Sequence, residues 1–210
     1  MIRIIVADDH AILRQGLRQI LVAQADMEVV GEASNYGEIM REVRKEASDV
    51  LLLDIAMPGK NGIDTLKQVK QEYPRLPVLV LSMYPEDQYA IRALKAGASC
   101  YLTKVTAAEQ LVLAIRTVVR GRRYITAELA ESLAANITGD QDVPAHETLS
   151  DREFQTLRNI AAGKTLAQIG DELALSPKTV SVYRARLLAK LHLSSNAELT
   201  RYAIENKLVE

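Results

Sequence analysis

The stretch Val50-Leu51-Leu52-Leu53-Asp54 is an apolar run that ends in an aspartate. Such a run predicts a buried strand whose final aspartate faces solvent at the carboxyl end. A second apolar run ends at Asp8 and Asp9, and a third comes just before Lys104. In an open α/β sheet, ligands bind at the edge formed by the carboxyl ends of the strands. If these strands are neighbours, three carboxylates and one ammonium group converge on one pocket.

Apolar runs and helical periodicity alternate along the first 121 residues. The predicted strands are Arg3–Ala7, Met27–Ala33, Val50–Asp54, Pro77–Ser82 and Cys100–Thr103. Helices between such strands imply right-handed crossovers, and therefore a parallel sheet with helices on both faces. We expect an α/β domain that ends where Gly121 stops the last helix.

Composition places the chain among globular proteins. It has 210 residues, of which 48% are hydrophobic and 25% are charged, and this size suits one or two domains. No apolar stretch approaches the roughly 18 residues of a membrane span, and no signal peptide is evident. Because Cys100 is the single cysteine, no internal disulfide can form. We expect a cytoplasmic protein with no membrane partner.

The charge distribution marks a boundary. Residues 125–147 carry five acids and no Lys or Arg, whereas residues 1–124 carry 17 basic and 15 acidic residues and residues 148–210 carry 9 and 7. The expected organisation is a domain over residues 1–121, a linker over 122–147 and a second domain over 148–210. Within the linker, Ala127–Asn136 predicts a short helix, and Thr138–Pro144 has turn chemistry.

Residues 148–210 predict a smaller, all-α domain of four helices. The strongest signal is Ser176-Pro177, which suits a helix with Ser as N-cap and Pro in the first position. The predicted helices run from Thr148 or Ser150 to Gly163, from about Thr165 to Leu173, from Pro177 to Leu191, and from Asn196 onward. The short second helix and the tight turn before the third have helix-turn-helix spacing.

The pocket of carboxylates suits phosphoryl chemistry. Clustered carboxylates repel one another unless a hard divalent cation such as Mg²⁺ neutralises them, and that cation also accepts phosphate oxygens. Asp54 would then be a nucleophile able to form an aspartyl-phosphate. Lys104 would pair with the phosphoryl oxygens, and Ser82 would donate a hydrogen bond to one of them.

These residues resemble the two-component receiver domain across residues 1–121. The resemblance rests on Asp8-Asp9, Asp54 with Met57-Pro58 and Gly62, Ser82, and the stretch Gly97–Lys104. It implies a flavodoxin-like five-stranded parallel sheet of order 2-1-3-4-5. It further implies that Asp54 is the phospho-acceptor and that Lys104 binds the phosphate. Ser82 and Tyr101 would form the switch. Mg²⁺ would be held by Asp9, Asp54 and the Ala56 backbone carbonyl, with support from Asp8.

Three positions distinguish this chain within that resemblance. Ala56, two residues after the acceptor, cannot hold a hydrolytic water, and Tyr84 could shield the acyl phosphate. We therefore predict slow self-dephosphorylation. Val105 stands where many receivers have a proline, which makes a cis bond there unfavourable.

The predicted helix Pro177–Leu191 carries four bases and no acid. Seen alone, this is most simply a solvated face, but it would also suit a helix in the DNA major groove. The region 148–210 resembles the LuxR-type domain through Leu149–Glu153, Ile160–Gly163, Gln168-Ile169, Leu175–Val180, Tyr183 and Lys190-Leu191. The resemblance implies that the base-facing positions are Ser181, Val182 and Ala185, and we expect phosphate contacts from Lys178, Thr179, Tyr183, Arg186 and Lys190.

Gly170 is unusual for the second helix of such a domain. Glycine costs up to about 1 kcal/mol of helix propensity relative to alanine. Our hypothesis is that close helix packing requires it.

A receiver followed by a LuxR-type domain is the arrangement of NarL/FixJ-type response regulators. The resemblance implies a bacterial two-component regulator, not an enzyme beyond weak self-dephosphorylation. A sensor histidine kinase would phosphorylate Asp54, and the phosphorylated homodimer would bind double-stranded promoter DNA, with RNA polymerase a further candidate partner. Asn196–Glu205 resembles the family's dimerisation helix, with Leu199, Tyr202 and Ala203 as candidate contacts.

Three other interpretations stay open. The receiver could be phosphate-independent, although its intact pocket argues against this. A metal-dependent phosphatase using Asp54 would need a second acid two residues later, where Ala56 stands. The basic helix could instead bind an acidic protein partner, which a salt-dependent shift with promoter DNA would exclude.

Overall fold

The computed structural model describes residues 1–45, 48–57, 62–84, 86–106, 108–138 and 144–209. The chain divides into two compact units, Met1–Thr138 and Gly139–Glu210. Among the described helices, none has both the length and the apolar character that a membrane crossing requires.

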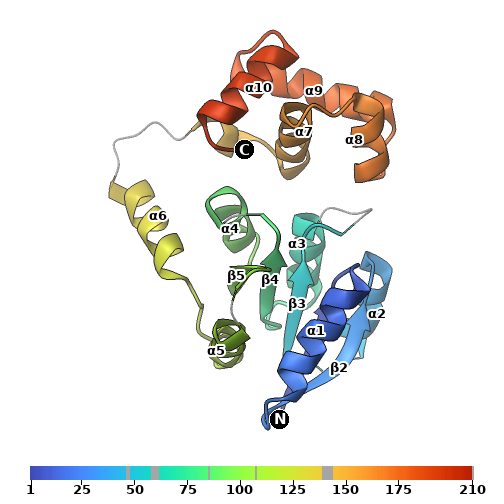
Figure 1. Cartoon of the computed structure of the whole chain (residues 1–210), viewed down its shortest axis with the longest axis vertical. Coiled ribbons are helices and arrows are strands. Elements are labelled where there is room, and N and C mark those ends of the chain that lie inside the picture. Colours follow the sequence, from blue (N-terminus) through green and yellow to red (C-terminus); the bar gives the residue numbers. More distant parts are fainter. Residues whose placement is uncertain (46–47, 58–61, 85, 107, 139–143, 210) are drawn as a thin grey trace. The chain divides into compact units, whose positions relative to one another are not determined.

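The first unit is built on a five-stranded parallel sheet (Figure 1). Its strands are β1 (Ile2–Ala7), β2 (Met27–Ala33), β3 (Val50–Asp54), β4 (Val78–Ser82) and β5 (Cys100–Thr103). Their order in the sheet is β2-β1-β3-β4-β5, and every neighbouring pair is parallel. This confirms the predicted α/β fold and strand order, and each strand boundary lies within one residue of its prediction.

Helices cover both faces of this sheet because each parallel connection crosses over. They are α1 (Ala11–Val22), α2 (Tyr36–Arg44), α3 (Gly62–Glu72), α4 (Glu86–Lys95) and α5 (Ala108–Val119). One core cluster joins α1 and α5 to one face of the sheet, with Ile4 and Leu52 among its members. Strands β3 and β4 are buried along their whole length, as their continuous apolar runs predict.

The chain after α5 stays attached to the first unit. Tyr124 forms an isolated parallel bridge with Cys100, and its N–H donates to the Ser99 carbonyl at 3.1 Å. Helix α6 (Ala127–Thr138) follows and includes the predicted Ala127–Asn136 segment. Residues 139–143, within the segment of predicted turn chemistry, lie outside the described residues.

The second unit contains a 3₁₀ turn, η1 (Ala145–Thr148), and four α-helices. The turn was not predicted from the sequence. The helices are α7 (Asp151–Ala161), α8 (Leu166–Leu173), α9 (Pro177–Leu191) and α10 (Asn196–Glu205), which confirms the all-α expectation. Of the two N-cap candidates for α7, the structure selects Ser150, whose hydroxyl accepts from the Glu153 N–H in a capping box.

Gly170 lies in the last turn of α8, shortly before the chain turns toward α9. A Cβ at this position would lie 2.6 Å from the carbonyl oxygen of Leu175, and the Leu175 N–H donates to the Gly170 carbonyl at 2.8 Å. Glycine is therefore needed because the backbone of the helix-turn-helix turn comes so close. The close neighbour is this turn, and not a packed helix as hypothesised.

Two candidate dimer contacts are not available on the surface. Leu199 and Ala203 are fully buried, because α10 packs against α7. Tyr202 is half-buried and its hydroxyl accepts a hydrogen bond from the His146 N–H at 3.1 Å. The exposed face of α10 carries Ala197, Arg201 and Ile204 instead.

Candidate functional site

The ends of β1, β3 and β5 bring three predicted residues together. The Lys104 ammonium lies 2.7 Å from Asp54 Oδ2 and 2.6 Å from Asp8 Oδ2. All three side chains are almost inaccessible, with exposed fractions of 4% for Lys104, 1% for Asp8 and 0% for Asp54. The expectation that Asp54 faces solvent was therefore wrong, because the Lys104 side chain and the surrounding backbone cover it. The contact spans residues far apart in sequence, and it forms because the carboxyl ends of parallel strands meet at one edge of the sheet.

The backbone after β3 shapes the floor of this site. The Ala56 N–H donates to Asp54 Oδ1 at 2.8 Å, which fixes the second carboxylate oxygen. At the start of α3, a Cβ on Gly62 would lie 2.2 Å from the Ile55 Cα. Glycine is thus required for the chain to return against the end of β3. Pro58, part of the same motif, lies outside the described residues.

His10 belongs to this cluster, although we did not predict it as a site residue. Its ring Nδ1 lies 3.0 Å from Asp9 Oδ1 and 3.2 Å from Asp8 Oδ1. Its backbone N–H donates to Asp8 Oδ1 at 2.8 Å. Its place directly after the acid pair was the available signal. A histidine next to carboxylates is, however, usually a solvated side chain, and this ring is 66% exposed.

The donor set suits a divalent cation. Asp8, Asp9, His10 and Asp54 each offer one ligand atom, and these atoms lie within 4.8 Å of one another. Asp8 Oδ2 and Asp9 Oδ1 are buried and accept no hydrogen bond of good geometry, although Lys104 and His10 lie within ion-pair distance of them. Buried carboxylate oxygens with incomplete hydrogen bonding suit a hard cation, and receiver domains generally hold Mg²⁺ at an acidic pocket of this kind.

Burial and charge act in opposite directions on the pKa values here. Burial raises the pKa of Asp54 above its usual value, and the hydrogen bonds from Lys104 and the Ala56 N–H only partly oppose this. Burial lowers the pKa of Lys104, but its close contacts with the Asp54 and Asp8 carboxylates outweigh that effect and the pKa is raised. Lys104 therefore stays cationic, and the cluster gains most from a further positive charge near Asp54.

The two predicted switch residues are linked through Tyr84. Ser82 is fully buried at the end of β4, and its hydroxyl oxygen accepts from the Tyr84 N–H at 3.0 Å. Tyr101 is also fully buried, and its hydroxyl donates to the Tyr84 carbonyl at 2.8 Å. The backbone of Tyr84 thus joins a side chain from β4 to one from β5.

In the second unit, α9 presents part of its predicted DNA-contacting set to solvent. Exposed members are Lys178, Ser181, Val182, Ala185, Arg186 and Lys190. Thr179 and Tyr183 are half-buried, and the Thr179 hydroxyl is 2.8 Å from the Ser176 hydroxyl at the start of the helix. The Lys190 ammonium contacts Glu153 Oε2 at 2.7 Å. Lys178 and Arg186 are therefore the cations best placed to meet a phosphate backbone.

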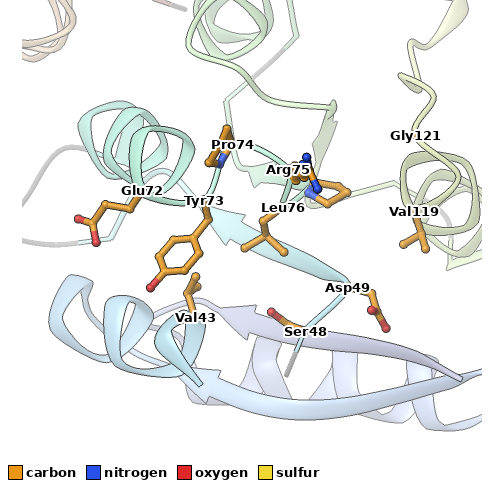
Figure 2. Close-up of a pocket in the computed structure, with 11 residues that line it drawn as sticks. Val43, Ser48, Asp49, Glu72, Tyr73, Pro74, Arg75, Leu76, Val119 and Gly121 are labelled. Atoms are coloured by element: carbon orange, nitrogen blue, oxygen red, sulfur yellow. The ribbon is translucent and has the colours of Figure 1, made fainter. Parts of the chain in front are cut away.

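A separate cleft lies at the opposite, amino-terminal edge of the sheet (Figure 2). It has a volume of about 560 Å³, and its lining includes Val43, Asp49, Tyr73 and Val119. Asp49 is already paired with Arg3, with Nη2 and Oδ1 3.0 Å apart. The lining is mixed in character, and none of the clustered carboxylates near Asp54 belongs to it.

Comparisons with known proteins identify the family of each unit. Residues 4–116 match the response regulator receiver domain, and residues 147–203 match the luxR family of bacterial regulatory proteins. The oxygen regulatory protein NreC of Staphylococcus haemolyticus is 37% identical over 99% of both chains. The response regulator UvrY of Escherichia coli is 35% identical over 99% of this chain and 96% of its own.

Solved structures give the same result. RcsB from Salmonella enterica serovar Typhimurium, bound to promoter rprA in the presence of the phosphomimetic BeF₃⁻, matches 96% of this chain and 97% of its own, with 26% identity and a TM-score of 0.69. A LuxR-family two-component response regulator from Aurantimonas covers 65% of this chain and 98% of its own, with 32% identity and a TM-score of 0.61. With a receiver and a LuxR-type DNA-binding domain both matched, this chain belongs to the NarL/FixJ-type response regulators, which regulate transcription.

Proposed function

We propose that Asp54 accepts a phosphoryl group from a sensor histidine kinase and that this controls DNA binding by α9. The observation that carries the proposal is the buried contact of the Lys104 ammonium with both Asp54 and Asp8. A lysine held there is already placed to pair with the oxygens of a phosphoryl group on Asp54.

The transfer needs little more than positioning. An Asp54 carboxylate oxygen attacks the phosphorus of a phosphohistidine, the P–O bond forms, and the P–N bond breaks with imidazole as the leaving group. The Ala56 N–H, which now donates to Asp54 Oδ1, fixes the orientation of the attacking carboxylate. Asp8, Asp9, Asp54 and the Ala56 carbonyl would hold Mg²⁺, which neutralises charge on the phosphoryl oxygens.

The signal would leave the site through Ser82. Tyr101 already lies in its buried position, hydrogen-bonded to the Tyr84 carbonyl, so the remaining movement falls on the Ser82 hydroxyl. That hydroxyl would donate to a phosphoryl oxygen, and the surrounding loop would adjust to it. A population shift between two loop arrangements is the expected consequence.

For the output, we propose that residues 1–121 receive the signal, residues 122–147 link the domains and residues 148–210 bind double-stranded DNA. Ser181, Val182 and Ala185 would face the bases, where Val182 and Ala185 suit thymine methyl groups. Two copies would read half-sites about one DNA turn apart. We propose that the exposed α10 residues Ala197, Arg201 and Ile204 form the dimer contact. We also propose that the protein acts in the cytoplasm, with RNA polymerase as a partner at the promoter.

The deciding experiment measures promoter binding and oligomeric state of the full chain. It compares protein treated with Mg²⁺ and BeF₃⁻ with untreated protein and with Asp54→Ala. Asp26→Asn is the matched control, because Asp26 is a half-buried carboxylate that pairs with Arg116 at the opposite edge of the sheet. We expect tighter binding and dimerisation in the treated wild type and in Asp26→Asn, and neither in Asp54→Ala. Equal binding in every sample would mean that the receiver acts independently of phosphorylation.

A further inference from the structure

Helix α6 in the linker is docked on the first unit. It packs against α4, as Figure 1 shows. Leu129 of α6 is only 1% exposed, although the neighbouring Glu128 and Ala130 are exposed. The helix is anchored at its start, where the Thr126 hydroxyl accepts from the Leu129 N–H at 3.2 Å and is itself buried. Part of α4 is thus covered by a segment of the same chain.

Two tyrosine rings connect α4 to the switch residues. Tyr84 follows β4, and its ring stacks on that of Tyr89 in α4, with ring centroids 4.7 Å apart and planes inclined by 20°. Tyr89 is 2% exposed, so the ring lies inside the packed structure. Ring stacking is directional, and close packing transmits a displacement of one ring to the other.

Phosphorylation of Asp54 would disturb this stack through the backbone of Tyr84. The Ser82 hydroxyl now accepts from the Tyr84 N–H. When the hydroxyl moves toward a phosphoryl oxygen, that hydrogen bond either breaks or pulls the Tyr84 backbone with it. In both cases one of the two hydrogen bonds that fix the Tyr84 backbone changes, while the other, from the Tyr101 hydroxyl to the Tyr84 carbonyl, remains. The ring of Tyr84 then moves relative to Tyr89.

We infer that α4 is a docking surface for α6 of the same chain, and that the Tyr84–Tyr89 stack makes this docking sensitive to the state of Ser82. Closely packed helices change between discrete arrangements, so a displaced Tyr89 weakens the packing of α6 on α4. Released α6 lengthens the tether between the receiver and the DNA-binding unit. This inference rests on the proposed function, because it takes phosphorylated Asp54 as the input.

The test is hydrogen exchange of the full chain, measured by mass spectrometry with and without Mg²⁺ and BeF₃⁻. Peptides from residues 127–138 report the docking of α6, because local opening sets the exchange rate of helical amides. A peptide containing Asp54 and Ala56 reports whether BeF₃⁻ has bound. The variants are Tyr84→Leu, which removes the stacked ring without altering α4 itself, and Tyr84→Phe, which keeps a ring as the matched control.

In wild type and Tyr84→Phe, we expect BeF₃⁻ to protect the Asp54 peptide and to raise α6 exchange at least about fivefold. In Tyr84→Leu, the Asp54 peptide should still be protected while the ratio of α6 exchange rates stays near one. A protected Asp54 peptide with unchanged α6 exchange in wild type would overturn the inference alone. A full response in Tyr84→Leu would also overturn it. An unprotected Asp54 peptide in wild type would contradict the phospho-acceptor proposal and this inference with it.

Discussion

The Lys190 ammonium lies 2.7 Å from Glu153 Oε2, which joins the base-rich helix α9 to the first turn of α7. The Glu153 side chain is 3% exposed, and Oε2 also accepts from the Ser150 N–H at 2.8 Å. Lys190 therefore has a structural partner inside its own unit, as does Arg184, whose Nε–H donates to Asn196 Oδ1. The basic character of a helix does not by itself identify which cations meet DNA.

Lys190→Met should destabilise the DNA-binding unit. It leaves the buried Glu153 carboxylate without its charged partner, which we expect to cost about 1–3 kcal/mol of the free energy of unfolding. Urea denaturation of the full chain, followed by circular dichroism, measures the change. The matched control is Lys178→Met, an exposed cation on the same helix. It should change stability by less than about 0.5 kcal/mol and lower the salt slope of DNA binding by about one.

The opposite pattern would change the assignment of these two lysines. If Lys190→Met kept wild-type stability and lowered the salt slope as Lys178→Met does, Lys190 would be a phosphate contact as the sequence suggests. The ion pair with Glu153 would then contribute little to folding.

The same pair predicts a pH dependence of stability. Burial alone would raise the pKa of Glu153, but hydrogen bonds from Lys190 and Ser150 outweigh it, so the pKa lies below the ordinary value of 4.5. A lowered folded-state pKa contributes stability that is present above about pH 4.5 and is lost as the pH falls through the folded value. Glu153→Gln removes this contribution. The stability gap between wild type and Glu153→Gln should therefore narrow as the pH falls below about 4.5, and a gap that stays constant with pH would contradict the linkage.

The strands could be predicted from the sequence because each is a short apolar run with a sharp polar end. Val50–Asp54 and Cys100–Thr103 coincide with the observed strands. The order of the strands came from the resemblance to receiver domains, since periodicity does not say which strands are neighbours. Once that order holds, Asp8 and Asp54 lie at the ends of the adjacent strands β1 and β3. The long side chain of Lys104 reaches them from the end of β5, beyond β4.

Contacts between helices were harder to predict. The apolar stripe of α10 could face its own domain core or a partner protein, and periodicity cannot distinguish these two possibilities. In the structure, Leu199 and Ala203 are buried where α10 packs against α7. The ion pair between Lys190 and Glu153 joins residues 37 positions apart and has no local signal. The need for glycine at position 170 depends on the path of the turn that follows.

Gly170→Ala should weaken both folding and DNA binding. Alanine improves helix propensity by about 1 kcal/mol, but its Cβ would lie 2.6 Å from the Leu175 carbonyl oxygen. We expect the resulting displacement of the turn to cost about 1–3 kcal/mol, so that the net change is destabilising. Gly16→Ala in α1 is the matched control, because a Cβ there meets nothing within 4 Å and should stabilise the protein by up to about 1 kcal/mol.

Urea denaturation and promoter affinity together test this prediction. A stabilised Gly170→Ala variant with unchanged affinity would mean that the turn relaxes around the methyl group at no cost. Equal effects of the two substitutions would remove the distinction between a crowded and an open glycine.

Ala56→Asn should shorten the lifetime of the phosphorylated protein. Ala56 lies two residues after Asp54, is exposed, and has no side chain that could orient a water molecule toward an acyl phosphate. An asparagine amide at this position could do so, and we expect its decay to be roughly tenfold faster or more. Ala25→Asn makes the same change at an exposed site before β2 and should leave the lifetime unchanged. After phosphorylation by a small phosphodonor, loss of labelled phosphate in the presence of Mg²⁺ gives the rates. Wild-type decay within seconds would show that hydrolysis does not depend on a side chain at position 56.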